Sequence, residues 1–259
     1  MALFTDADVV TLDDLSKFET SLVQVASSHG INVETKIALS MSAIGDRLMQ
    51  WLLSVGASDP QWMNRRVLGL STVVMTPTLR RWICFDALAR FYSEAYNIQL
   101  NTRFQGKWTE YQNEAVEAAG MVFRSGLGIV YNALPKPAMP LVSVQDGTFP
   151  AQSVFVQTAW VDAQGNESAL SMVNGQILSG AAAVAVGMAE GAVNVPSAAM
   201  GWNIYASSTQ DGLTRQNATP LSVGSTWDMP SNGLIAGSTP IDGQLPNYYI
   251  TLSREIQRG

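Results

Sequence analysis

The side chains best suited to catalysis are scarce in this chain of 259 residues. It contains one histidine, His29, and one cysteine, Cys84, so a Cys–His nucleophile would require these two residues to meet. His29 precedes Gly30, where a helix is expected to end and an imidazolium would complement the helix dipole. Cys84 lies in an apolar helical stretch that is typical of a buried, inert thiol. A zinc site of Cys and His ligands is excluded.

Pairs of carboxylates can act as general acid and base or hydrolyse glycosides, but those in this sequence have simpler interpretations. Asp13 and Asp14 suit the N-terminus of a helix. Glu110, Glu114 and Glu117 share one helix face, which is typical of a solvated surface. The carboxylates of the C-terminal half lie mostly in expected turns; they are Asp146, Asp162, Glu167, Glu190, Asp211, Asp228, Asp242 and Glu255. We expect no enzymatic activity, no cofactor and no metal.

The arginines are the better candidates for binding. They outnumber the lysines, and two adjacent pairs and a fifth residue are grouped in the first half of the chain: Arg65, Arg66, Arg80, Arg81 and Arg90. The planar guanidinium group is favoured at protein interfaces, so these five residues are candidate interface contacts. Pairing within the chain, with acids such as Asp86 and Glu94, is an alternative of equal weight.

The charge composition excludes one large class of function. The net charge is -6 and only 14% of the residues are charged, against about 25% in average soluble domains. A protein that binds nucleic acid by neutralising phosphates needs an excess of clustered basic residues. The half that carries the arginines has a net charge of -1 and no basic run longer than two residues. A surface so poor in charge suits lasting contacts with other proteins. We expect no targeting signal, and no membrane span because no run of about 18 apolar residues occurs.

The elements that must position these residues change type near residue 135. Prolines at positions 135, 137 and 140 prevent a helix and favour an extended linker. Beyond this point the chain contains more glycine, and acidic residues outnumber basic residues more strongly. We therefore expect an α+β chain of several parts: a helical domain over residues 1–134, a proline linker over 135–140, an antiparallel β-sandwich over 141–245 and an extended tail over 246–259.

Four amphipathic stretches predict that the first part is a helical bundle. The first follows a capping box of Thr11 and Asp14, and the third begins at the favourable pair Thr76-Pro77. The fourth stops before Gly126-Leu127-Gly128, which lacks the third glycine of a dinucleotide-binding fingerprint and indicates a helix end. The four helices are expected over about residues 12–29, 33–55, 77–95 and 103–124.

Alternating apolar residues and regular turns predict that the second part is a small antiparallel sandwich of roughly 100 residues. Ser153 to Val161 forms the clearest strand. A turn at 163–166 leads to a returning segment, Glu167 to Met172. Further strands are expected around residues 184–188, 202–205 and 221–227.

Two segments of the second part resemble the fibronectin type III and immunoglobulin-like domains of tailed-phage virion proteins. The first is the strand and turn Phe155–Ser171, with Asp162-Ala-Gln-Gly-Asn-Glu-Ser168 at its centre, and the second is Gly201-Trp-Asn-Ile-Tyr205. The segment Gln216–Trp227 resembles the strand pair that follows. The resemblance covers about residues 141–243 and implies a fibronectin III/Ig-like sandwich.

The first part is similar to phage head-to-tail connector proteins, also called adaptors. The matching features are the helices, Ser125-Gly-Leu-Gly-Ile-Val130 and Pro135-Lys-Pro137. The resemblance implies a structural protein of the virion neck, assembled in the host cytoplasm as a homo-oligomeric ring, typically of twelve subunits. Such a ring binds the portal protein and tail or nozzle proteins, and DNA passes through its channel without specific binding. On this basis the five arginines become candidate subunit or portal contacts.

The tail has the alternation of a strand without a domain of its own. Tyr248, Ile250, Leu252 and, one register later, Ile256 are its apolar positions, and such a strand can add to the sheet of a neighbouring subunit. A disordered terminus is the alternative.

Two other functions are compatible with the sequence. A tail-fibre or baseplate module could bind host carbohydrate or other tail proteins through the sandwich, with Trp202 or Trp227 exposed on one face. A glycosidase acting with two carboxylates is the third hypothesis.

Overall fold

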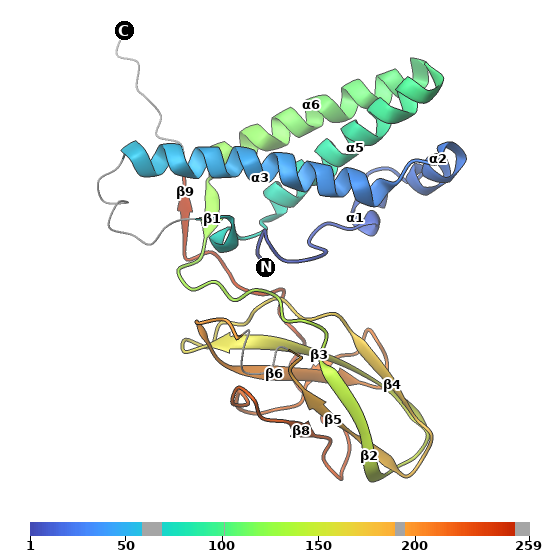
Figure 1. Ribbon diagram of the computed structural model, residues 1–259, viewed down its shortest axis with the longest axis vertical. Coiled ribbons are helices and arrows are strands. Elements are labelled where there is room, and N and C mark those ends of the chain that lie inside the picture. The colour runs from blue at the N-terminus through green and yellow to red at the C-terminus, as the bar shows by residue number, and fades with distance from the viewer. Residues whose placement is uncertain (59–68, 101, 190–194, 252–259) are drawn as a thin grey trace. The chain divides into compact units, whose positions relative to one another are not determined.

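The computed structural model describes residues 1–58, 69–100, 102–189 and 195–251, and the chain separates into two compact units (Figure 1). The helical unit holds Ala7–Ile129 and the segment from Pro246 onward. The β unit holds Met1–Asp6 and Val130–Leu245. A helical N-terminal region followed by antiparallel β-sheets confirms the expected α+β class.

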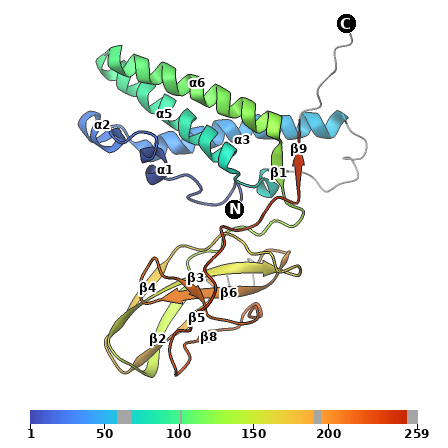
Figure 2. The same ribbon diagram turned by 180° about the vertical axis from the view of Figure 1, so that it is seen from behind.

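The helical unit is built on an α5–α6 hairpin against which α3 packs through α5 (Figure 2). The start of α5 agrees with the sequence, because Thr76 Oγ1 accepts a hydrogen bond from the Leu79 backbone and Pro77 occupies the first turn. The helices, including the short 3-10 helix η1, are α1 Leu12–Ser16, α2 Leu22–His29, α3 Val33–Ser58, η1 Leu70–Thr72, α5 Pro77–Gln99 and α6 Thr102–Ser125.

The single helix expected over residues 12–29 is wrong, because the structure divides it into α1 and α2. The capping box of Thr11 and Asp14 is present at the start of α1, and Gly30 ends α2 in the left-handed conformation (φ 66°). Between the two helices the chain turns so that Glu19 is buried. Its carboxylate accepts hydrogen bonds from Ser21 and Tyr111, and these contacts hold the break.

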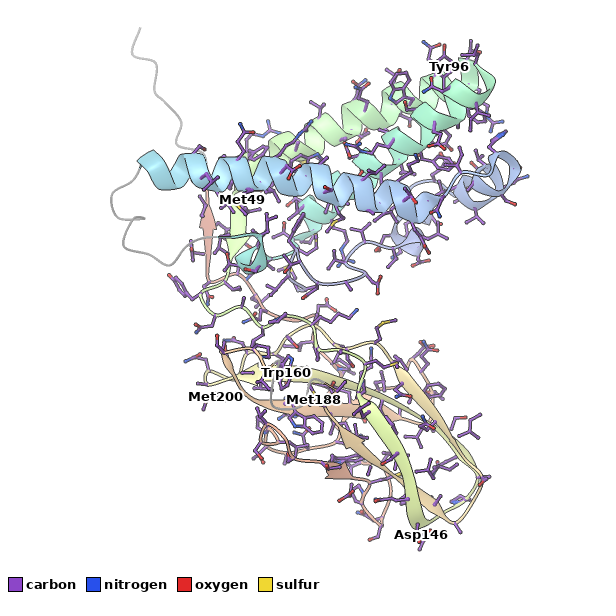
Figure 3. The ribbon with its side chains drawn as sticks, viewed as in Figure 1. Met49, Tyr96, Asp146, Trp160, Met188 and Met200 are labelled. Carbon is purple, nitrogen blue, oxygen red and sulfur yellow. The ribbon has the colours of Figure 1, made fainter. Side chains whose placement is uncertain are left out.

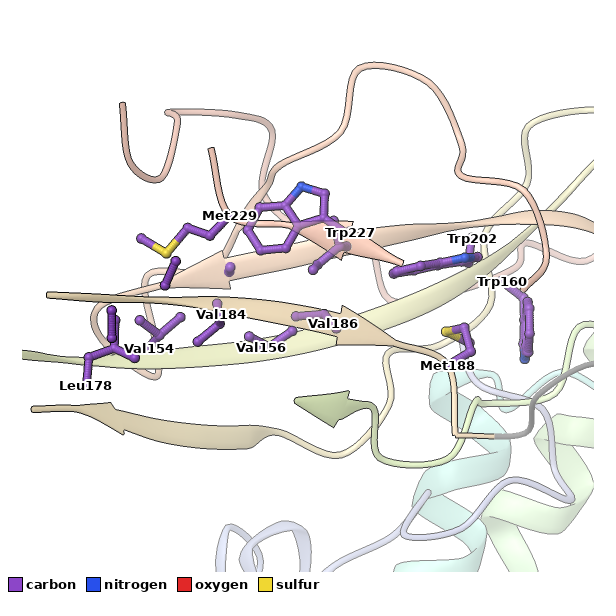
Figure 4. Close-up of a cluster of buried hydrophobic side chains, with 14 of the residues drawn as sticks. Val154, Val156, Trp160, Leu178, Val184, Val186, Met188, Trp202, Trp227 and Met229 are labelled. Carbon is purple, nitrogen blue, oxygen red and sulfur yellow. The ribbon is translucent and has the colours of Figure 1, made fainter. Parts of the chain in front are cut away.

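The β unit contains two antiparallel sheets, with strand orders β2-β5-β8 and β4-β3-β6-β7. Side chains of both sheets form one buried cluster, including Trp160, Trp202 and Trp227 (Figure 4). The strands are β2 Leu141–Phe149, β3 Gln152–Asp162, β4 Asn174–Leu178, β5 Ala182–Gly187, β6 Ala199–Ser207, β7 Thr214–Arg215 and β8 Trp227–Asp228.

One of the expected strands is wrong, and three observed strands of the β unit were not expected. Residues 221–227 do not form one strand: Leu221 bridges to Trp202, a turn follows, and β8 begins only at Trp227. The turn includes a hydrogen bond from the Ser225 backbone to Ser222 and a positive φ at Gly224. Strands β2, β4 and β7 were not expected.

The segment from Val130 to Pro140 has no helix or strand, and it is held to the β unit at several points. Leu134 is buried in the core of that unit, and its backbone N–H donates to the side chain of Gln244. The backbone N–H of Lys136 donates to Asp6, which places residues 1–6 in the same unit. The observed units therefore differ from the expected boundaries at both ends of the helical domain.

Two short strands, β1 (Leu127–Ile129) and β9 (Tyr248–Ile250), pair antiparallel within the helical unit. β1 ends directly before Val130, and β9 begins shortly after Leu245, so the two strands flank the main segment of the β unit in the sequence. Chain segments far apart in sequence thus meet in one small sheet.

Candidate functional site

Two of the candidate arginines are paired within the chain. Arg90 Nε donates to Asp86 Oδ2 at 2.7 Å, and the same oxygen accepts from Ser40 Oγ at 2.6 Å. Arg80 Nη1 lies 3.7 Å from Asp14 Oδ2. These contacts support the intramolecular interpretation for Arg80 and Arg90. Arg81 is exposed on α5, whereas Arg65 and Arg66 lie outside the described residues.

A shallow groove of about 420 Å³ lies among α3, α5 and α6, and Arg90 is one of its lining residues. Its charged side chains are matched in sign: Lys36 pairs with Glu94, and Arg90 pairs with Asp86. Trp108 and Leu39 add apolar surface. With its charges already paired, the groove offers polar and apolar contacts to a protein surface and no unpaired charge for a small charged ligand.

The carboxylates of α6 lie as expected from their spacing. Glu110, Glu114 and Glu117 are all exposed, and Glu110 pairs with Lys107 at 3.4 Å. This face of the helix is therefore solvated in the single chain.

The tail residues Tyr248 and Ile250 pair with the same chain. Tyr248 lies opposite Ile129 and Ile250 opposite Leu127 in the β1–β9 ladder, and Ile250 is buried. The backbone N–H of Asn247 adds a hydrogen bond to Ile129 O at 2.9 Å. Leu252 and Ile256 lie outside the described residues. The expected strand is thus present over Tyr248–Ile250, but its partner is β1 of the same chain and not the sheet of a neighbouring subunit.

The glycines of the Gly126-Leu127-Gly128 motif allow the C-terminal segment with β9 to lie close to the end of α6 and to β1. A Cβ at position 128 would lie 2.7 Å from Cγ of Pro246 and 3.3 Å from Cγ2 of Thr76. A Cβ at position 126 would lie 3.0 Å from Ile250 O, and Gly126 also has a positive φ of 95°. The motif ends α6, as expected, and it also forms the seat for the C-terminal strand.

The turn that carries the resemblance is organised by Asp162. Its Oδ1 accepts hydrogen bonds from the backbone N–H groups of Gln164 and Asn166, and its Oδ2 accepts from the Asn166 side chain. Gly165 supplies the positive φ of 81°. This Asx-type turn reverses the chain and brings Glu167 back beside β3, where it bridges to Val161.

Glu167 then joins the two segments that carry the resemblance. Its Oε1 accepts from Asn203 Nδ2 and its Oε2 from the Tyr205 hydroxyl, both at 2.6 Å. Arg215 Nη1 lies 3.8 Å from Oε1, and Arg215 Nη2 donates to Asn203 Oδ1. Glu167 and Asn203 are buried, so the network satisfies polar groups that would otherwise be costly to bury. Burial, followed by the hydrogen bond to Glu167, raises the pKa of Tyr205.

Serines replace part of the ladder beside β3. Ser168 Oγ accepts a hydrogen bond from the Trp160 backbone, and Ser171 Oγ accepts from the Thr158 backbone. The backbone N–H groups of the same two serines donate back to the carbonyls of Trp160 and Thr158. The expected returning segment 167–172 therefore does lie along β3, although its serine side chains take the place of regular pairing.

A second buried carboxylate, Glu19, is the centre of a polar cluster in the helical unit. Its Oε1 accepts from Ser21 Oγ at 2.6 Å, its Oε2 accepts from the Tyr111 hydroxyl at 2.9 Å, and Lys107 Nζ lies 3.3 Å away. Burial opposes ionisation, but these hydrogen bonds and the Lys107 charge outweigh it and lower the pKa of Glu19 to about 2. Tyr92 and Phe85 stack on Tyr111, so the cluster anchors the turn between α1 and α2.

His29 and Cys84 occupy structural positions. His29 lies in the last turn of α2 and meets Phe104 edge-to-face, with ring centroids 5.4 Å apart. Cys84 is buried in α5, and this burial raises the pKa of its thiol to about 12. Within the described ranges, no group of three or more His, Cys, Asp or Glu residues is arranged to hold a metal ion.

Sequence reasoning missed the roles of Glu19 and Arg215. Only the burial of Glu19 beside Tyr111, far away in sequence, shows its role, and no local pattern marks it.

Among the helices that are described, none is both long and apolar enough to cross a membrane. Comparisons with protein-family models, curated proteins and solved structures found no match to the chain.

Proposed function

We propose that the chain is a structural protein of a tailed-phage virion that forms a ring at the neck, joins the portal to the tail and extends the DNA channel. The observation that carries the proposal is the meeting of the two resembling segments at one carboxylate. Glu167, from the turn after β3, accepts hydrogen bonds from Asn203 and Tyr205 of β6. Residues singled out by the resemblance are thus the residues that hold this part of the β unit together.

We assign the β unit to the fibronectin III/Ig-like sandwiches on the same basis. Two antiparallel sheets with a shared core of tryptophans and aliphatic side chains support this assignment. The helical unit supplies the second element of the proposal, a helical hairpin that ends in the Gly126-Leu127-Gly128 seat.

A ring repeats one head-to-tail contact, so each subunit must offer two different surfaces. Arg81 is the candidate arginine that remains exposed on a described helix without an ion pair among the described residues. The exposed carboxylates of α6 provide the opposite charge. A channel wall with few basic groups would let DNA pass without binding, because its phosphates are not neutralised.

The structure does not support the carbohydrate-binding alternative, because the tryptophans that it requires on the surface are buried. It depends on Trp202 or Trp227 being exposed, and their exposed fractions are 0% and 7%. Both side chains belong to the core cluster (Figure 4). We therefore do not extend the proposal to a fibre or baseplate module.

Native mass spectrometry and electron microscopy of the full chain test the proposal, with the chain alone and mixed with the portal protein of the same phage. We expect a closed ring, of about twelve copies if the connector pattern holds, attached to the portal. A chain that stays monomeric and unattached in both samples would overturn the proposal.

A variant pair tests the candidate contact separately. Arg81→Glu is expected to weaken ring formation, whereas Arg124→Glu is the matched control, because Arg124 is also exposed but was not assigned to an interface. Equal ring yields from both variants would remove Arg81 from the contact.

A further inference from the structure

One edge of β2 has no strand partner among the described residues. β2 covers nine residues, Leu141–Phe149, and within the described part of the chain it pairs with β5 alone. Its second edge therefore presents backbone N–H and C=O groups without a strand partner, which is the usual template for pairing with another chain. Three other strands end the two sheets of the β unit, namely β4, β7 and β8. β7 and β8 have two residues each, and such shortness protects a sheet edge, whereas β4 has five residues and its Asn174 side chain donates to the Pro140 carbonyl directly before β2.

The first five residues of β2 lack the charged side chains that normally protect a long edge. No residue from Ala138 to Gln145 is charged, and Asp146 begins the irregular end of the strand (Figure 3). There the register shifts between Asp146 and Phe149, and a Cβ at Gly147 would lie 2.5 Å from the backbone of Ala182. The regular and uncharged part of the edge is thus the segment Leu141–Gln145.

The inner face of this edge is incompletely covered. Val142 lies opposite Val186 and Val144 opposite Val184 across the β2–β5 ladder, so both valines of β2 face the core side. Val184 and Val186 are fully buried, but Val144 is 51% exposed. A further strand alongside β2 would cover Val144 on the side that β5 does not reach.

One antiparallel register pairs all five residues of Leu141–Gln145 with the same segment of a second copy. When Ser143 lies opposite Ser143 of a second copy, Val142 lies opposite Val144 twice on the inner face, and Leu141 lies opposite Gln145 twice on the outer face. Asp146 then faces Pro140, where pairing stops. An antiparallel register centred on Val144 would instead place Asp146 opposite Val142. A register centred on Asp146 would place the two Asp146 side chains opposite each other, and like charges in that position are destabilising.

We infer that β2 is a docking edge for β2 of a second copy of this chain, paired antiparallel about Ser143, so that two three-stranded sheets join into one. The contact is two-fold and self-complementary, unlike the head-to-tail contact of a ring. It therefore does not rest on the proposed function, and either inference can fail alone. Five paired residues make a small interface, so the association is weak and depends on protein concentration.

Disulfide capture in the full chain tests the register. Ser143 is exposed, and the native Cys84 is buried, so a cysteine introduced at position 143 would be the reactive one. Directly opposed residues have Cα atoms about 5 Å apart, within the reach of a disulfide. Ser143→Cys is therefore expected to form a covalent dimer under mild oxidation.

Gln145→Cys is the matched control on the same face of the same strand. In the inferred register two copies of residue 145 lie about 14 Å apart, too far for a disulfide. A mixture of Leu141→Cys and Gln145→Cys chains is instead expected to cross-link, because these positions lie opposite each other. Absence of a Ser143→Cys dimer, equal dimer yields from Ser143→Cys and Gln145→Cys, or capture of a different virion protein by Ser143→Cys would overturn the inference.

Discussion

The buried carboxylate of Glu19 makes the stability of the helical unit dependent on pH. The folded chain lowers the pKa of Glu19 from 4.5 to about 2. One pKa unit corresponds to about 1.4 kcal/mol, so the ionised group contributes about 3 kcal/mol to the free energy of unfolding. Because the folded pKa is the lower one, this contribution is complete well above pH 4.5 and is lost as the pH falls towards 2.

The substitution Glu19→Gln isolates this effect from the titration of other carboxylates. The glutamine removes the charge that faces Lys107 and leaves fewer acceptors for Ser21 and Tyr111. We expect it to cost about 2–3 kcal/mol at pH 7. Between pH 7 and pH 3 the wild type loses about 2 kcal/mol of the Glu19 contribution, so the difference between the two proteins should shrink by that amount.

Urea unfolding at both pH values, followed by circular dichroism at 222 nm, measures this difference. Glu117→Gln is the control, because Glu117 is exposed on α6, and it should change the stability by less than about 0.5 kcal/mol. A stability difference between wild type and Glu19→Gln that is the same at pH 7 and pH 3 would refute the reasoning.

Three further predictions concern the β unit, the tail and the thiol. Glu167→Ala leaves Asn203 and Tyr205 without their acceptor, so urea unfolding followed by tryptophan fluorescence should show a loss of about 3–5 kcal/mol; a similar loss for the exposed Asp211→Ala would contradict this. Gly128→Ala places a Cβ 2.7 Å from Pro246, so limited proteolysis should release the C-terminal segment faster than in Gly106→Ala, where the Cβ meets open space; equal rates would remove the steric explanation. Cys84, whose thiol pKa is raised to about 12 by burial, should react with a thiol reagent only in denaturant, and rapid labelling of the native chain would show that this site opens.

Local signals were enough to predict most of the helical unit. The Thr11–Asp14 capping box, the Thr76-Pro77 start and the Gly30 stop act within one turn of the backbone, and all three are present in the structure. The division between α1 and α2 depends instead on Tyr111, which is 92 residues away from Glu19. Spacing within residues 12–29 carries no information about that partner.

The strands were predictable where burial follows alternation and not elsewhere. β3 and β6 carry the core tryptophans Trp160 and Trp202 and were expected near their observed positions. β2 was missed because an edge strand with an exposed face has weaker apolar alternation. Residues 221–227 alternate like a strand, but the Ser222–Ser225 turn interrupts them.

The candidate site shows the same limit. The arginine spacing was compatible with two interpretations, and only the positions of Asp14 and Asp86 show that Arg80 and Arg90 are paired within the chain. For the tail, alternation predicted a strand but could not identify its partner. The seat is formed by glycines, whose importance depends on how closely another segment approaches.

The β1–β9 pair has a consequence for how this chain can change in evolution and in the laboratory. Ile129 and Tyr248 face each other at one end of the ladder, where a hairpin would have its turn. The β unit is inserted at that point, apart from the six N-terminal residues that belong to it. A two-residue Asn-Gly turn could join the two strands, so a whole domain can be removed, exchanged or acquired there without altering the order of the helices.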